Sequence, residues 1–163
     1  MNAALIEIRP LTPADAAAYR DIRLAGLRES PEAFGSTFDR ENIQPFAWFR
    51  DRLAASRVFG AFCSADLLGI AGFAIREGEK ERHKGLLWGM YVRPDVRKAG
   101  LGRQLVEAVV EYGLERDSLK QNERYYDEIL MALDLRLDLS RYALSEPGAG
   151  STLCEELASS TAK

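Results

Sequence analysis

The sequence predicts an α+β fold in which a mostly antiparallel sheet is flanked by helices. Three observations support this prediction. A short alternating segment precedes a long helical one near the N-terminus, three apolar runs with short polar links follow, and a further helical segment comes after a glycine-rich turn. Neighbouring strands with short links pair antiparallel, because a parallel partner needs a crossover of a dozen or more residues.

The length and composition fit one domain. The chain has 163 residues, of which 47% are hydrophobic, enough to bury a single core. We place this domain at residues 1–139 and assign 140–163, where small and polar residues dominate, to a flexible C-terminal tail. A net charge of −3 and a pI near 5.3 argue against nucleic acid or a membrane surface as a partner, since both need a basic surface.

The sequence shows no targeting or metal-binding signal. No apolar run approaches the roughly 18 residues of a membrane span, and the N-terminus lacks the zones of a signal peptide. We therefore expect a cytoplasmic protein. Cys63 and Cys154 have no metal-ligand or redox-motif neighbours, so we expect two free thiols and no metal site.

The N-terminal third predicts a strand and two helices. Residues 5–9 alternate apolar and polar side chains, as in a half-buried strand. Thr12 and Pro13 are typical of the N-cap and first position of a helix, which we extend over 13–29. Residues 30–36 are typical of an irregular loop, and 45–55 carry the apolar spacing of a second helix.

The central part predicts an antiparallel meander. We expect strands over 58–63, 67–76 and 84–92, joined by a tight turn at 64–66 and a polar loop at 77–83. A helix over about 101–112 follows, with apolar residues at helical spacing, and 125–139 alternates as a further strand.

The stretch 90–103 is the most informative part of the sequence. It runs from the apolar strand end Met90-Tyr91-Val92 into a basic, glycine-rich turn that opens a helix. The first amides of a helix lack partners inside the helix and carry partial positive charge, so they bind anions. Gly100 and Gly102 let a phosphate approach the main chain, and Arg97, Lys98 and Arg103 add cationic charge. A P-loop is excluded because no Gly-Lys-Ser/Thr follows, and no acidic strand end follows as in a dinucleotide fold.

The pattern Arg-x-x-Gly-x-Gly after a strand ending Tyr-Val-x-Pro resembles the acyl-CoA pyrophosphate motif of the GNAT acyltransferase superfamily. The resemblance implies acetyl-CoA as the acyl donor and an amine as the acceptor. It implies that the Val92 amide faces the thioester oxygen and that Phe34 and Phe38 line the acceptor lip. The donor-binding residues that it implies are Met90, Tyr91, Val92, Arg97, Lys98, Ala99, Gly100, Leu101, Gly102 and Arg103.

The resemblance breaks after the helix that follows the motif. GNAT proteins place a parallel strand and a further helix there, whereas this chain passes near 112–115 towards a segment, 125–131, that resembles the closing strand of the family. We therefore expect a fold that is incomplete at the parallel strand. In the family, the further helix that is missing here often carries the general acid, so we assign no catalytic residue. Tyr112, Tyr125 and Tyr126 are more simply packing residues, and His83 is a solvated surface residue.

The resemblance implies an N-acyltransferase that moves an acetyl group from acetyl-CoA to a primary amine of a small molecule or peptide by direct attack. The alternative is a catalytically impaired remnant that binds CoA or a protein partner. A third alternative is a defective variant that folds poorly and self-associates through its uncovered strand edge. A homodimer stays open as an assembly.

Overall fold

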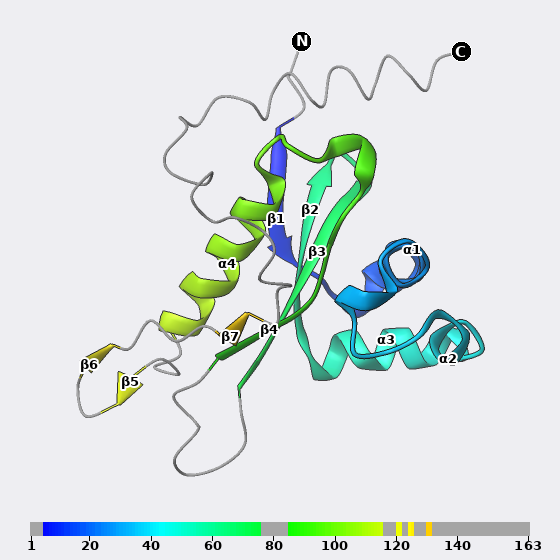
Figure 1. The fold of residues 1–163 in the computed structure, drawn as a ribbon, viewed down its shortest axis with the longest axis horizontal. Coiled ribbons are helices and arrows are strands. Elements are labelled where there is room, and N and C mark those ends of the chain that lie inside the picture. Colours follow the sequence, from blue (N-terminus) through cyan, green and yellow to red (C-terminus); the bar gives the residue numbers. More distant parts are fainter. Residues whose placement is uncertain (1–4, 76–84, 116–119, 122–123, 126–129, 132–163) are drawn as a thin grey trace.

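The computed structural model describes residues 5–75, 85–115, 120–121, 124–125 and 130–131 (Figure 1). Short 3-10 turns at Pro13–Asp15, Pro31–Ala33 and Pro94–Val96 connect the main elements. The helices are α1 (Ala16–Glu29), α2 (Phe38–Asn42), α3 (Phe46–Ala55) and α4 (Leu101–Glu115). The strands are β1 (Ile6–Pro10), β2 (Arg57–Cys63), β3 (Asp66–Ile75), β4 (Gly85–Val92), β5 (Lys120–Gln121), β6 (Arg124–Tyr125) and β7 (Leu130–Met131).

The main sheet has the order β1-β2-β3-β4-β7. The pairs from β1 to β4 are antiparallel, which confirms the predicted meander. β7 pairs with β4 in parallel, through Leu86 with Leu130 and Leu87 with Met131. The described parallel partner is therefore two residue pairs long, beside a β4 of eight residues.

The expected closing strand over 125–139 needs a correction. Arg124–Tyr125 pairs with β5 in a separate two-stranded sheet, and Leu130–Met131 joins the main sheet in parallel. The described residues of the predicted strand are thus divided between two sheets. Residues 126–129 and 132–139 lie outside the described part of the chain.

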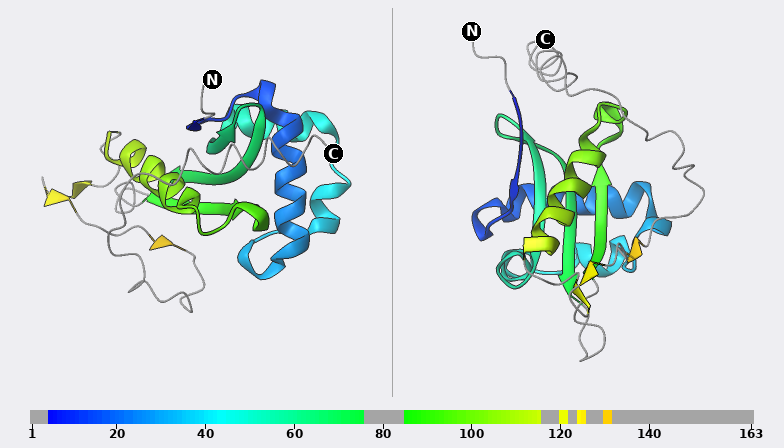
Figure 2. Two further views of the ribbon diagram at one scale, coloured as in Figure 1. Left: turned by 90° about the horizontal axis from the view of Figure 1, so that it is seen from above. Right: turned by 90° about the vertical axis from the view of Figure 1, so that its left-hand side faces the viewer.

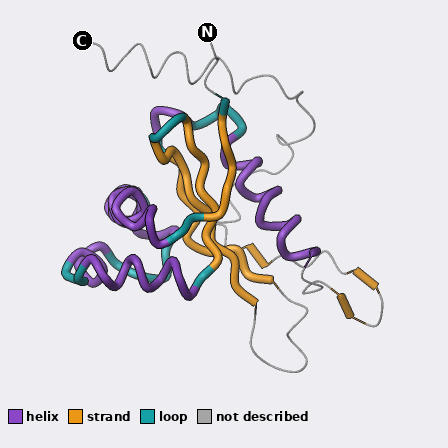
Figure 3. The backbone as a smooth tube through the Cα atoms, turned by 180° about the vertical axis from the view of Figure 1, so that it is seen from behind, coloured by secondary structure: helices purple, strands orange, loops and turns teal. Residues whose placement is uncertain are grey.

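Helices cover both faces of the sheet (Figures 2 and 3). One core lies between the sheet, α1 and α3 and includes Tyr19, Phe49, Val58 and Ile70. The other lies between the sheet and α4; its buried residues are Phe59, Ala61, Ala71, Phe73, Leu87, Leu105 and Val109. Neighbouring residues of β2 and β3 thus enter opposite cores, as the two-residue period of a strand requires.

A bulge interrupts β4 midway. Ile70 pairs with Tyr91 and Gly72 with Trp88, so β4 has one extra residue between the pairs. Gly89 lies within this bulge and has φ +60°, a left-handed conformation that favours glycine. The bulge separates the start of β4, which pairs with β7, from its end, which leads to the glycine-rich turn.

The predicted element bounds agree closely with the structure over the described ranges 5–75 and 85–115. The helix α2 is missing from the prediction, which has no element between 36 and 45; Thr37 caps it by accepting a hydrogen bond from Arg40 N at 3.4 Å. Cys63 is disulfide-bonded, so the expected free thiol there is wrong. The described helices include none with the length and apolar character needed to span a membrane. The loop 77–83, Cys154 and the segment 140–163 lie outside the described residues.

Candidate active site

The turn before α4 presents unbonded amides. Arg97 N donates to Pro94 O at 3.4 Å, and the next amide with a protein acceptor, Gln104 N, donates to Gly100 O at 3.1 Å. Between them, the amides of residues 98–103 donate to no oxygen of the described residues. These donors lie at the positive end of a fifteen-residue helix, an arrangement that favours an anion, and we call residues 98–103 the cradle.

The backbone of the cradle depends on left-handed residues. Lys98 has φ +71° and Gly100 φ +81°. A Cβ added at Gly100 would have no atom within 4 Å, so that side of the turn faces open space. A Cβ added at Gly102 would lie 3.1 Å from the Met90 side chain, which shows how closely α4 approaches β4. The two glycines therefore have different roles. Gly100 allows the left-handed conformation, and Gly102 allows the close packing of helix and strand.

The three cationic side chains of the turn are engaged to different degrees. Arg97 Nε donates to Val92 O at 2.9 Å, and its Nη2 lies 4.0 Å from Glu29 Oε2. Arg103 Nε donates to Glu107 Oε1 at 2.7 Å. Lys98 is exposed and has no ion-pair partner among the described residues. Lys98 is thus the cation most readily available to an incoming anion.

One edge of the end of β4 has no strand partner among the described residues, and we call it the uncovered edge. Beyond Leu87, no strand of the described residues pairs with β4 on the side away from β3. Tyr91 is buried there, and its hydroxyl donates to Glu29 Oε2 at 2.7 Å. Burial, followed by this hydrogen bond and the Glu29 charge, raises the pKa of Tyr91 to about 12. The uncovered edge leads from the bulge directly to the cradle.

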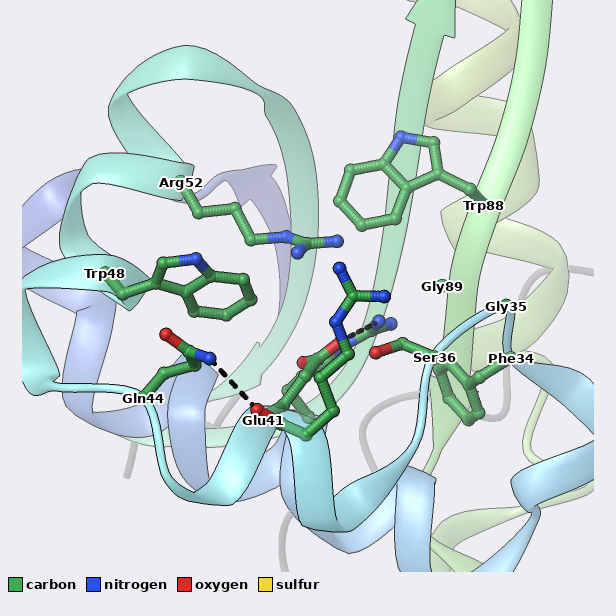
Figure 4. A pocket seen from close by; sticks show the side chains of 11 residues that line it. Phe34, Gly35, Ser36, Glu41, Gln44, Trp48, Arg52, Trp88 and Gly89 are labelled. Carbon is green, nitrogen blue, oxygen red and sulfur yellow. Dashed lines mark hydrogen bonds and ion pairs between the residues drawn. The ribbon is translucent and has the colours of Figure 1, made fainter.

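A pocket of about 350 Å³ lies beside the bulge (Figure 4). α1, the loop before α2, α2 itself, α3 and β4 all contribute to it. Its lining residues are Arg23, Phe34, Gly35, Ser36, Arg40, Glu41, Gln44, Trp48, Arg52, Trp88 and Gly89. The volume is within the range of small-molecule sites, and the position beside Gly89 places the pocket next to the uncovered β4 edge.

A buried ion pair forms the base of the pocket. Arg23 and Glu41 are 3% and 2% exposed, and Arg23 donates to both Glu41 oxygens, at 3.0 and 2.8 Å. Burial alone would raise the pKa of Glu41, but the hydrogen bonds and charge of Arg23 outweigh it, so the pKa is lowered. Arg23 Nη1 is buried without a hydrogen-bond partner among the described residues, and a Cβ at Gly89 would lie 2.8 Å from it.

A stacked arginine forms one wall of the pocket. Arg52 lies over Trp48 and Trp88, with its Cζ 4.9 and 5.0 Å from the two ring centroids, and Figure 4 shows it between the two indoles. Trp88 rests on Gly72 of β3, because a Cβ at Gly72 would overlap its indole ring. The aromatic contacts fix the guanidinium without neutralising its charge.

The structure brings the predicted donor residues together along one path, from Met90, Tyr91 and Val92 to Arg97, Lys98, Ala99, Gly100, Leu101, Gly102 and Arg103. Phe34 lines the pocket, as expected for an acceptor lip. Phe38 is absent from the pocket lining and packs under Arg28 instead, with the guanidinium 4.3 Å from its ring. Trp88 is half-buried and lines the pocket.

Sequence reasoning missed the charged lining of the pocket. Arg23, Glu41 and Arg52 come from three helices, and no local spacing connects them. The one available signal was Trp48 with Arg52, four residues apart on one helix face.

Residues 22–125, from α1 to β6, match the model of the Acetyltransferase (GNAT) family. The chain belongs to this family. The predicted resemblance is thereby confirmed, and acetyl-CoA, the donor that GNAT acetyltransferases use, is the donor of this enzyme. No curated protein matches the chain.

Solved GNAT structures share the fold of this enzyme. An acetyltransferase from Clostridium acetobutylicum, crystallised with acetyl-CoA, is 18% identical over 88% of this chain and 92% of that one, with a TM-score of 0.61. A GNAT acetyltransferase from Streptococcus pneumoniae is 20% identical over 68% of each chain, with a TM-score of 0.57. An aminoglycoside acetyltransferase from a soil metagenomic sample, in complex with sisomicin, is 17% identical over 88% and 92%, with a TM-score of 0.60.

Proposed function

We propose that this GNAT enzyme transfers the acetyl group of acetyl-CoA to a primary amine of a small molecule or peptide by direct attack. The observation that carries the proposal is the row of unbonded amides at 98–103, which follows directly after the uncovered end of β4. These amides would hold the diphosphate, with Lys98 as a further contact. The β4 edge at Met90–Val92 would pair with the pantetheine arm as an added strand would.

The proposed reaction has two bond changes. The amine nitrogen attacks the thioester carbon, and the oxygen becomes an oxyanion that the Val92 amide stabilises. The C–S bond then breaks, the new amide nitrogen loses a proton and the thiolate gains one. Because the Glu41 carboxylate accepts two hydrogen bonds from Arg23 and its pKa is lowered, it is a poor base, so the amine arrives unprotonated or passes its proton to water.

The test uses the purified full chain with acetyl-CoA and a panel of amines. Thermal stabilisation by acetyl-CoA reports binding, and release of free thiol reports transfer. We expect saturable thiol release with at least one amine class, above the rate of hydrolysis without amine. No stabilisation by acetyl-CoA would overturn the proposal.

The second candidate function is a CoA-binding remnant without turnover. The observation in its favour is the two-pair length of β7, since a long parallel partner would form the second wall beside the donor. Stabilisation by acetyl-CoA without thiol release from any amine would select this candidate.

A further inference from the structure

We propose that the pocket beside Gly89 selects an acceptor amine that also carries a carboxylate, such as a free amino acid, and that Arg40 and Arg52 bind that carboxylate. This inference rests on the proposed function, because it assigns the acceptor class of the same site. It starts from the charges that line the pocket, which are three arginines and one carboxylate.

One arginine and the carboxylate neutralise each other. Arg23 and Glu41 form a buried pair with two hydrogen bonds, and neither is more than 3% exposed. Arg40 and Arg52 have no carboxylate within ion-pair distance among the described residues. The described pocket therefore has an excess of two positive charges, and no protein anion there balances them.

The position of Arg52 is prepared for an anion. Trp48 and Trp88 hold its guanidinium on both sides, so little side-chain freedom is lost when a ligand binds. Its Nε is buried without a hydrogen-bond partner at standard distance among the described residues, and the buried Tyr19 hydroxyl interacts with the same guanidinium. A guanidinium with free N–H groups matches the two oxygens of a carboxylate. Arg40 lines the same pocket from α2 and supplies the second cation.

The cationic pocket also discriminates between amines. A polyamine would bring further positive charges next to Arg40 and Arg52, which costs binding energy. An amino acid offsets those charges with its carboxylate. The same positive field disfavours the ammonium form of the acceptor, lowering its pKa and raising the share of free amine. This effect compensates for the weak basicity of Glu41.

The experiment compares acids with their amides. The panel contains L-alanine and L-phenylalanine with their carboxamides, spermidine, and O-phosphoethanolamine to separate a carboxylate from a phosphate site. An amino acid amide has the less basic amine, so its free amine is more abundant and ionisation cannot explain a preference for the acid. We expect the acids to have a kcat/KM at least about tenfold higher, as for the loss of a charge-assisted hydrogen bond.

Variants connect this preference to the two arginines. Arg40→Gln and Arg52→Gln should each reduce the ratio of acid to amide about tenfold, as for a lost charged hydrogen bond. Arg50→Gln is the control, because Arg50 lies on α3 but outside the pocket, with an exposed side chain paired to Asp51. Arg52→Lys retains the charge and should retain part of the preference. Thermal unfolding of each variant checks that it is folded.

The outcomes separate this inference from the proposed function. If amides, spermidine or O-phosphoethanolamine react as well as the acids, or if the preference survives in the Arg40→Gln/Arg52→Gln double variant, the carboxylate inference fails while acetyl transfer stands. If no amine releases thiol, the transfer proposal fails. In that case the carboxylate site is tested by thermal stabilisation with N-acetyl-L-phenylalanine and with its amide. Stabilisation by the acid alone, lost in the double variant, supports the site. No stabilisation by the acid overturns the carboxylate inference.

Discussion

The cradle and the pocket are built from different parts of the chain. The cradle at 98–103 offers main-chain amides, fixed by two left-handed residues and one helix end. The pocket offers side chains from α1, α2, α3 and β4, fixed by an ion pair and stacked rings. A main-chain site depends on a few consecutive residues, whereas a side-chain site depends on the packing of distant elements. Gly89 lines the pocket, and the side chain of the next residue, Met90, lies against Gly102 of the cradle.

The largest expected effect concerns the base of the pocket. Glu41→Gln leaves the buried Arg23 guanidinium without a counter-charge, which should lower the free energy of unfolding by about 3–5 kcal/mol. Urea unfolding measures this loss. Asp51→Asn is the control, because the Arg50–Asp51 pair is exposed and its removal should cost less than about 1 kcal/mol. Equal losses in the two variants would show that the buried pair contributes no more to stability than the exposed pair.

The stability that the buried Arg23–Glu41 pair contributes also depends on pH. The folded-state pKa of Glu41 is lowered, so its contribution to stability is present above the usual pKa of a glutamate. The contribution is lost as the pH falls through the folded-state value. The difference in stability between wild type and Glu41→Gln should therefore shrink as the solution is acidified below about pH 4, where unfolded glutamate takes up its proton.

The second effect concerns the cradle. In Gly100→Ala, the new Cβ points into the open space where the diphosphate would lie, so the Kd for acetyl-CoA should rise about 100-fold, or about 2.7 kcal/mol. The left-handed conformation of residue 100 should cost about 1 kcal/mol of stability. Calorimetric titration measures the first value and urea unfolding the second.

The matched control for Gly100→Ala is Gly35→Ala, which changes the pocket and not the cradle. A Cβ at Gly35 also has no atom within 4 Å, but Gly35 lines the pocket. Gly35→Ala should leave the acetyl-CoA Kd unchanged within about twofold, a difference smaller than one ordinary hydrogen bond. A similar loss of acetyl-CoA binding in both variants would contradict the division into two sites.

The contrast between the sites also explains what the sequence could predict. The cradle follows from consecutive residues, since Gly100, Gly102 and the helix that they open are visible in the printed chain. The antiparallel meander follows from apolar runs with short links. The Arg23–Glu41 pair was not predictable, because it joins residues of two helices whose angle depends on the core around Tyr19 and Phe49. The short α2 was missed since five residues give too little periodicity.

The pairing of β7 with β4 could not be predicted for a related reason. Leu130 and Met131 stand in an apolar stretch, and the sequence alone does not say which strand a two-residue pair joins. Residues 125–139 alternate in the sequence, and alternation predicts a strand but neither its neighbour nor its direction. Among the described residues the parallel pairing is two residue pairs long, which agrees with the prediction that this side of the fold is incomplete.

A third prediction disturbs the pocket while sparing the cradle. Trp88 lies on Gly72, and a Cβ there would displace its indole ring. Gly72→Ala should lower stability by about 1–3 kcal/mol through overpacking and raise the acceptor KM, because Trp88 also holds Arg52. The acetyl-CoA Kd should stay within about twofold, because residues 98–103 are not in contact with the ring. Steady-state kinetics with both substrates varied separates the two effects, and a parallel loss of both would show that β4 transmits the change.

The smallest expected effect concerns Tyr91, which connects α1 to the end of β4 between the two sites. Tyr91→Phe removes its 2.7 Å hydrogen bond to Glu29 and should cost about 1 kcal/mol at neutral pH. In the wild type the phenol pKa is raised to about 12, so this contribution is present below the ordinary tyrosine pKa of about 10 and is lost as the pH rises towards 12. Ultraviolet titration of the phenolate, taken as the difference between wild type and Tyr91→Phe, measures the pKa directly. Glu29→Gln keeps an acceptor for the hydroxyl but removes the charge, so the pKa should fall part of the way while most of the stability remains. An unchanged pKa in Glu29→Gln would mean that burial and the hydrogen bond set it, and that the charge of Glu29 does not contribute.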